Sequence, residues 1–261
     1  MSLRIAFDLD GVLADMDTAL AHQAEVAFGE ATARTLQNAS AVTPQPEASL
    51  DASAPCDPSD PSDQDASSSP AVVDIIPPVV KLNLTPRQER RLWRHIASVE
   101  DFWETLEETE PGVIMRLAEI AAARRWEIIF LTKRPKTMGG TAQVQSQRWL
   151  ASKGFPLPSV YVVQGSRGRI ASALDLDVVV DDRPENCLDV VIDSKARAIL
   201  VWREDEKALP TAARRLGIGV VQSVGDCLDI LTTLDKPDAQ QDPGILARVY
   251  RMLGLKETAG V

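Results

Sequence analysis

The feature that most constrains this chain is a short apolar run that ends in two closely spaced carboxylates. Residues 3–7 lead into Asp8, Leu9 and Asp10, and Gly11 follows directly. A short apolar run bounded by glycine is typical of a buried strand, and here we expect the strand to end at Asp8. Because side chains i and i+2 of an extended chain project to the same side, Asp8 and Asp10 should converge just beyond the strand.

This pair of carboxylates has two interpretations when it is taken alone. Two crowded carboxylates repel each other unless a positive group lies between them, and Mg²⁺ is a hard cation that prefers oxygen ligands and an incoming phosphate. However, Asp-Gly is also a common pair in solvated turns. The pair by itself is therefore compatible with either a metal site or a turn.

Composition and charge restrict the class of protein. The chain has 261 residues, of which 44% are hydrophobic, enough for one large domain or one domain with an insertion. Its net charge of −10 disfavours non-specific binding to nucleic acid or anionic membranes, so we expect neither as a partner. The sequence does not indicate an oligomeric state.

The sequence also suggests a cellular location. No apolar run is long enough for a transmembrane helix, and no signal-peptide pattern is present. The three cysteines are scattered and form no CxxC pair, which favours neither a disulfide framework nor a zinc site. We therefore expect a reducing, cytoplasmic environment.

Strands alternate with helices along most of the chain, and several of the expected strands are apolar throughout. This pattern is typical of an α/β fold with a Rossmann-like parallel sheet that has helices on both faces. The expected strands are residues 3–8, 127–131, 160–163, 177–180, 198–202 and 218–222. The expected helices are residues 15–37, 86–98, 101–109, 111–125, 141–152, 170–174, 184–194 and 224–234.

Residues 38–78 differ sharply in composition from the rest. They contain eight prolines and seven acidic residues but neither Lys nor Arg. Such a segment has little apolar surface to offset the entropy of ordering, so we expect a disordered insert at about 38–80. The helices around it lie between the first two strands and predict a small helical cap inserted after the first strand. The expected division is a core of residues 1–14 and 111–235, a cap of 15–110, and a linker with a C-terminal helix over 236–261.

Three of the expected strands end in polar residues of related chemistry. Asp8 and Asp10 follow the first strand, Thr132 and Lys133 follow the second, and Asp181 and Asp182 follow the strand at 177–180. In open parallel sheets the ligand site lies beyond the carboxyl ends of the strands. Carboxylates from two neighbouring strands could hold a divalent cation there, while a hydroxyl and a basic side chain hold a phosphate.

At these residues the sequence resembles the haloacid dehalogenase superfamily of phosphatases. Residues 7–12 are similar to its first motif, residues 131–132 to its second and residues 180–182 to its fourth. The longer stretches 8–15, 131–135 and 181–186 resemble the 5′(3′)-deoxyribonucleotidase-like branch. The resemblance covers residues 1–34 and 82–234.

The resemblance implies a role for each matching residue. Asp8 would attack phosphorus and form an aspartyl-phosphate, and Asp10 would protonate the leaving oxygen and then activate water. Thr132 would bind phosphoryl oxygens. The implied cofactor is Mg²⁺, held by Asp8, by the carbonyl of Asp10, and by Asp181 or Asp182.

The sequence departs from the family at one position. The family usually has a lysine before the fourth motif, whereas this region contains Arg167 and Arg169. Spacing favours Arg167, and its guanidinium could neutralise the same oxygens. Two alternatives stay open: both arginines could be surface residues, and Lys133 could supply the charge. Arg134, which follows Lys133, could contact the substrate phosphate or lie on the surface at a helix start.

The implied function is a Mg²⁺-dependent phosphomonoesterase whose partner is a small phosphorylated substrate, with nucleoside monophosphates as the leading class. Phe102 and Trp103 could stack on a nucleobase or belong to the core of the cap. A phosphatase of another small ester, and a catalytically silent binding protein with the same fold, are the alternatives. The insert and the missing lysine favour the silent protein, and the retained aspartates favour the enzyme.

Overall fold

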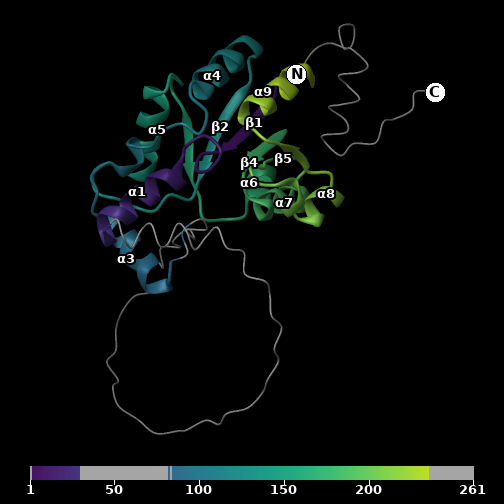
Figure 1. The fold of residues 1–261 in the computed structure, drawn as a ribbon. Coiled ribbons are helices and arrows are strands. Elements are labelled where there is room, and N and C mark those ends of the chain that lie inside the picture. Colours follow the sequence, from purple (N-terminus) through teal and green to yellow (C-terminus); the bar gives the residue numbers. More distant parts are fainter. Residues whose placement is uncertain (1, 30–81, 83, 235–261) are drawn as a thin grey trace, which may run out of the picture.

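The computed structural model describes residues 2–29, 82 and 84–234, and these build a parallel β-sheet between two layers of helices (Figure 1). Six strands lie in the order β3-β2-β1-β4-β5-β6, and every neighbouring pair is parallel. The strands are β1 (Arg4–Asp8), β2 (Glu127–Thr132), β3 (Ser159–Val162), β4 (Val178–Asp181), β5 (Arg197–Val201) and β6 (Gly219–Val221). The expected α/β fold is therefore confirmed.

Alternation along β1 explains why both faces of the sheet are covered. Ile5 and Phe7 belong to one buried cluster and Ala6 belongs to the other, because successive side chains of a strand point to opposite faces. The central strands β1 and β4 are therefore buried on both faces, whereas the edge strand β3 is largely exposed. The α-helices of the described residues are α1 (Met16–Phe28), α3 (Pro86–Ala97), α4 (Val113–Arg124), α5 (Ala142–Ser152), α6 (Arg167–Ala173), α7 (Pro184–Asp193), α8 (Thr211–Arg215) and α9 (Val224–Leu234).

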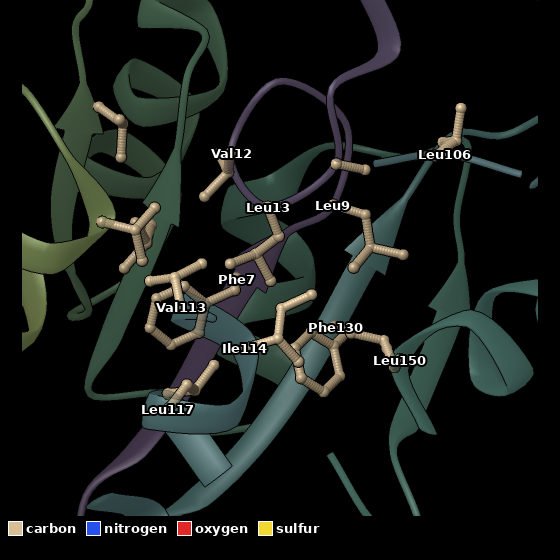
Figure 2. Packing of buried hydrophobic residues seen from close by; sticks show 14 of the residues in the cluster. Phe7, Leu9, Val12, Leu13, Leu106, Val113, Ile114, Leu117, Phe130 and Leu150 are labelled. Carbon is tan, nitrogen blue, oxygen red and sulfur yellow. The ribbon is translucent and has the colours of Figure 1, made fainter. Parts of the chain in front are cut away.

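The larger cluster packs α4 against the centre of the sheet. Figure 2 shows Val113, Ile114 and Leu117 of α4 gathered around Phe7 of β1 and Phe130 of β2. All five are buried. These contacts fix β1 and β2, the strands that carry Asp8 and Thr132, as the rigid centre of the molecule.

The smaller cluster covers the opposite face. Val179 and Leu200 of the sheet pack there with Ala171 of α6 and Val190 of α7. Cys187 in this layer and Cys227 in α9 are buried free thiols. The layer matters for function because α6 and α7 lie tightly together and carry polar residues to the edge of the sheet.

Between β1 and β2 the described residues form α1, α3, the short 3-10 helix η1 (Phe102–Glu104) and α4. In Figure 1, α1 and α3 lie side by side beyond the end of β1, and the ring of His95 lies 2.9 Å from Oε1 of Gln23. The position of these helices agrees with an insertion after the first strand. The division of the chain into a core and a cap stays a prediction.

Two expected helices differ in the structure. Residues 101–109 form only η1, because Asp101 has a φ of 48° and the Trp103 backbone amide donates to the Gln145 side chain at 3.0 Å. Helix α1 ends at Phe28, where the amide of Gly29 donates to the Glu25 carbonyl, and residues 30–37 of the expected helix lie outside the described residues. The predicted disordered insert and the predicted linker with its C-terminal helix lie outside the described residues.

Two short elements were not expected from the sequence. These are the 3-10 helix η2 (Glu206–Ala208) and α8, which connect β5 to β6. Among the described residues, no helix is long and apolar enough to cross a membrane.

Candidate active site

Asp8 is the last residue of β1, and the turn that follows it brings Asp10 to the same edge of the sheet. The amides of Leu13 and Ala14 both donate to the Leu9 carbonyl, so the chain folds back at once after the strand. Gly11 permits this turn with a φ of 84°. Asp8 is buried and Asp10 is partly buried, which confirms that the pair is not a solvated turn.

The fourth strand places two further carboxylates beside this turn. Asp181 ends β4 and is fully buried, and Asp182 follows it. A Cβ atom on Gly11 would lie 2.0 Å from Oδ2 of Asp182, so only glycine lets this carboxylate approach the turn. The sequence-predicted residues of the first and fourth motifs therefore meet at the carboxyl ends of β1 and β4.

Asp181 is held by groups that the sequence analysis did not assign. The Nδ2 atom of Asn186 lies 3.0 Å from both carboxylate oxygens, and the Arg183 amide donates to Oδ1 at 2.9 Å. Asn186 lies in the first turn of α7 and is buried. These bonds fix the orientation of Asp181 toward the site.

Arg167 is the basic residue that the structure brings to these carboxylates. It is the first residue of α6 and is buried; its Nη2 donates to Oδ1 of Asp8, and its Nε lies 3.5 Å from Oδ2 of Asp181. Arg169 is exposed. Of the two arginines, the structure therefore places Arg167 in the site and Arg169 on the surface.

A glycine makes the position of Arg167 possible. A Cβ atom on Gly168 would lie 2.0 Å from the carbonyl oxygen of Asp189 in α7. The absence of a side chain therefore allows α6 to lie directly on the backbone of α7. This close packing carries the start of α6, and with it Arg167, to the carboxylates.

The fold disfavours ionisation of the carboxylates at this edge. Burial raises the pKa of Asp8 well above its usual value, and Asp181 raises it further, whereas Arg167 lowers it. Burial likewise raises the pKa of Asp181, against the opposing effects of Arg167 and Asn186. Burial, followed by the charge of Asp181, raises the pKa of Asp182 to about 7. One guanidinium thus leaves uncompensated negative charge in the cluster.

Thr132 and Lys133, the residues predicted to bind phosphate, have different surroundings. Thr132 is buried at the end of β2, and its hydroxyl donates to Oδ2 of Asp10 at 2.9 Å. Lys133 is partly exposed and makes no hydrogen bond or ion pair with any described residue. Thr132 therefore contacts a carboxylate of the site, whereas the Lys133 side chain forms no hydrogen bond or ion pair with any of the described site residues.

Arg134 is a site residue whose place the sequence did not reveal. It is buried, and its Nη2 forms an ion pair with Oδ1 of Asp10 at 2.8 Å. Its burial contradicts the surface role at a helix start that the sequence left open. The two aspartates of the first motif are consequently paired with two different arginines.

An arginine–glutamate pair fixes the turn that carries Gly11. Arg203 donates to the carbonyl oxygens of Gly11 and Val12 and pairs with Glu110 at 3.1 Å. Glu110 also accepts from the first amides of α9, at Val224 and Gly225. A cavity of about 220 Å³ opens beside this turn, and its lining includes Asp15, Asp182 and Arg203.

The oxygen donors at this edge could supply some of the ligands of a small hard cation, but not a complete set. Within the described ranges, no three His, Cys, Asp or Glu side chains are close enough to hold a metal by themselves. Mg²⁺, however, is commonly held by one or two carboxylates, with water and substrate phosphate completing its ligands. The excess negative charge of Asp8, Asp181 and Asp182 suits such a cation.

Phe102 and Trp103 do not face a ligand. Both side chains are fully buried, with ring centroids 4.9 Å apart. The interpretation of both rings as core residues is confirmed, and stacking of these two rings on a nucleobase is wrong.

Fold and site together define an α/β protein with a buried carboxylate–arginine cluster at the carboxyl end of its central strands. No family model and no curated protein matches the chain. Among solved structures it is similar to a HAD family hydrolase from Deinococcus radiodurans R1 with bound phosphate and sodium, at 14% identity and a TM-score of 0.46, covering 90% of this chain and 96% of that one.

Two further solved structures have comparable values. A haloacid dehalogenase-like family hydrolase from Xanthomonas campestris has 14% identity and a TM-score of 0.45, with 96% of this chain and 98% of that chain covered. A hydrolase from Pseudomonas syringae has 16% identity and a TM-score of 0.44, with 90% and 98% covered. Likenesses at this level do not decide what the present chain does.

Proposed function

We propose that this chain is a Mg²⁺-dependent phosphomonoesterase of the haloacid dehalogenase type. The observation that carries this proposal is the convergence of Asp8, Asp181 and Arg167 at one buried edge of the sheet, with Asp10 two residues after Asp8. A buried carboxylate beside a guanidinium suits attack on a phosphate, because the cation attracts the same oxygens that the nucleophile must approach.

The proposed reaction has two balanced steps. In the first, a carboxylate oxygen of Asp8 bonds to phosphorus while the ester oxygen leaves and takes a proton from Asp10. In the second, water gives a proton to Asp10 and attacks phosphorus, which releases phosphate and restores Asp8. The two steps use Asp10 first as an acid and then as a base.

The remaining residues bind and orient the phosphate. Arg167 has an Nη1 atom that is buried and has no hydrogen-bond partner among the described residues, so it is available to a phosphoryl oxygen. The Thr132 hydroxyl lies beside Asp10 and could contact the same group. Asp8, the Asp10 carbonyl and Asp181 or Asp182 would hold Mg²⁺. When bound, Mg²⁺ would neutralise part of the charge that develops on the phosphoryl oxygens.

Nucleoside monophosphates are the proposed substrate class, and this rests on the sequence resemblance to the 5′(3′)-deoxyribonucleotidase-like branch. The burial of Phe102 and Trp103 removes the aromatic contacts that the cap could have offered to a base. Another small phosphate ester therefore stays a direct alternative as the substrate.

The test is phosphate release from a panel of nucleoside monophosphates and sugar phosphates, with Mg²⁺ or EDTA, for the wild type and Asp8→Asn. Mg²⁺-dependent release that is lost in the variant supports the proposal, and the preferred ester names the substrate. A folded wild type that releases no phosphate from any ester would contradict it and favour a silent binding protein.

A further inference from the structure

Arg134 contacts both carboxylate oxygens of Asp10. Its Nε donates to Oδ1 at 2.9 Å and to Oδ2 at 3.2 Å, and its Nη2 lies 2.8 Å from Oδ1. The arginine side chain is fully buried, and the carboxylate is 13% exposed. The planar guanidinium therefore contacts both oxygens of Asp10 and restricts the rotation of the carboxylate.

The guanidinium is itself held by two helical elements. Its central carbon lies 4.9 Å from the ring centroid of Trp103 in η1 and 5.6 Å from that of Trp149 in α5. Its Nη1 donates to the hydroxyl of Ser146 in α5 at 2.9 Å. Arg134 is thus fixed by aromatic rings and a hydroxyl as well as by its carboxylate partner.

The two tryptophans are fixed in turn. The indole of Trp103 donates to the Pro135 carbonyl at 3.0 Å, and that of Trp149 donates to the Leu106 carbonyl at 2.7 Å. Both side chains are fully buried. The orientation of Asp10 therefore depends on residues from the segment between β1 and β2 and from the helix after β2.

A stability role alone does not explain this arrangement well. A buried ion pair often contributes no more stability than apolar residues of similar volume, because both charges lose their hydration. Two tryptophans already supply apolar packing at this position. What the arginine adds is a defined direction for the Asp10 carboxylate.

We infer that Arg134 is a positioning residue that aims Asp10 at the leaving oxygen of the substrate. The inference rests on the proposed function, because it concerns the acid and base role of Asp10. Arg134 acts through Asp10 and does not touch the phosphate. Its loss should therefore matter most where the leaving group most needs a proton.

Two esters whose leaving groups differ in their need for a proton can test this expectation. The p-nitrophenolate ion leaves without much help from an acid, whereas an alkoxide needs a proton as the bond to phosphorus breaks. Arg134→Met should lower kcat/KM, which reports the first step, by about 10²-fold for the alkyl phosphate of the panel that the wild type hydrolyses best, within the usual range for acid–base catalysis. With p-nitrophenyl phosphate the first step should be slowed far less, and the phosphoenzyme should accumulate because hydrolysis also uses Asp10.

The matched control is Arg148→Met. Arg148 lies on α5 with its side chain 59% exposed, and its ion pair is with Glu104 rather than with Asp10. This variant should resemble the wild type with both esters. Arg134→Lys should recover only part of the loss, because an ammonium group cannot contact both carboxylate oxygens as a planar fork does.

The outcomes separate this inference from the proposed function. A wild type that releases no phosphate from p-nitrophenyl phosphate or from any ester of the panel overturns the proposed function, and the inference fails with it. An active wild type whose kcat/KM falls equally for both esters in Arg134→Met overturns the inference alone. If Arg134→Met does not fold, Ser146→Ala removes the Nη1 contact with little change in volume. It should show a smaller loss confined to the alkyl ester, and an equal loss on both esters would overturn the inference.

Discussion

Arg167 donates a hydrogen bond from Nη2 to Oδ1 of Asp8, which lies 159 residues earlier in the chain. The contact joins the first turn of α6 to the end of the central strand, and both side chains are buried. It places a guanidinium where the resemblance to phosphatases implies a lysine. We therefore expect Arg167 to be the cation that receives the phosphate.

Substitution of Arg167 tests this role. Arg167→Met should lower kcat/KM by about 10²- to 10³-fold, the range for removal of one donor to a developing oxyanion. Arg167→Lys should retain part of the activity, because the charge is kept while the fork is lost. Arg169→Met is the control, since Arg169 is exposed and should be replaceable without effect. A larger loss from Arg169→Met than from Arg167→Met would contradict the assignment.

The close packing of α6 on α7 gives a second prediction. In an exposed helix, Gly→Ala stabilises by about 1 kcal/mol, but at residue 168 the new methyl group would lie 2.0 Å from the Asp189 carbonyl. We expect Gly168→Ala to destabilise the fold by about 1–3 kcal/mol and to displace Arg167. Urea unfolding and phosphate release measure the two effects.

Gly165 supplies the matched control for that substitution. A Cβ atom there meets nothing within 4 Å, so Gly165→Ala should change neither stability nor activity by much. If Gly168→Ala stabilises the protein, α6 and α7 do not pack as closely as described.

The carboxylates predict how stability depends on pH. The pKa of Asp182 rises from a model-compound value of 3.8 to about 7 in the fold. Between these two values the folded state binds more protons than the unfolded state, so the metal-free protein should lose stability as pH rises from about 4 to about 7. The midpoint of thermal unfolding should therefore be lower at pH 7.5 than at pH 5.5 in EDTA.

Asp182→Asn tests whether this residue contributes to that slope. The variant removes the ionisation, so its unfolding temperature should change less between the two pH values. Glu119→Gln removes an exposed carboxylate on α4 and should leave the slope unchanged. If the unfolding temperature changes with pH to the same extent in the wild type and in Asp182→Asn, the fold does not raise the pKa of Asp182.

The same excess of negative charge predicts stabilisation by metal. Mg²⁺ added to the EDTA-treated protein at pH 7.5 should raise the unfolding temperature, because a ligand that binds only the folded state stabilises it by mass action. Asp181→Asn should abolish most of this shift, and Glu119→Gln should preserve it. An equal shift in Asp181→Asn and in the wild type would place any bound metal elsewhere.

The sheet was predictable from the sequence because its strands are short apolar runs. Predicted and observed strands differ by at most one residue at either end, for example residues 160–163 against β3 at Ser159–Val162. Buried parallel strands must be apolar on both faces, which leaves a clear pattern. Helix α8 was missed because five residues leave no periodic pattern to detect.

The candidate site was predictable where polar residues follow strands directly, as Asp8, Asp10, Thr132 and Asp181 do. The contact of Arg134 with Asp10 and the contact of Asn186 with Asp181 were not predicted, because they depend on partners brought together by the fold. A lone arginine before a proline is typical of a surface loop, and nothing local reveals that Trp103 and Trp149 lie against it. The one sequence signal for Asn186 was its place in the first turn of the helix after Asp181.

The most direct test of the central claim is to trap the covalent intermediate on Asp8. Wild-type protein is mixed with radiolabelled phosphate ester and Mg²⁺, quenched with acid within the first turnover, and digested to locate the label. The account predicts an acid-stable, base-labile phosphoryl group on the peptide containing Asp8, and none in Asp8→Asn. Label on another residue, or normal phosphate release by Asp8→Asn, would contradict it.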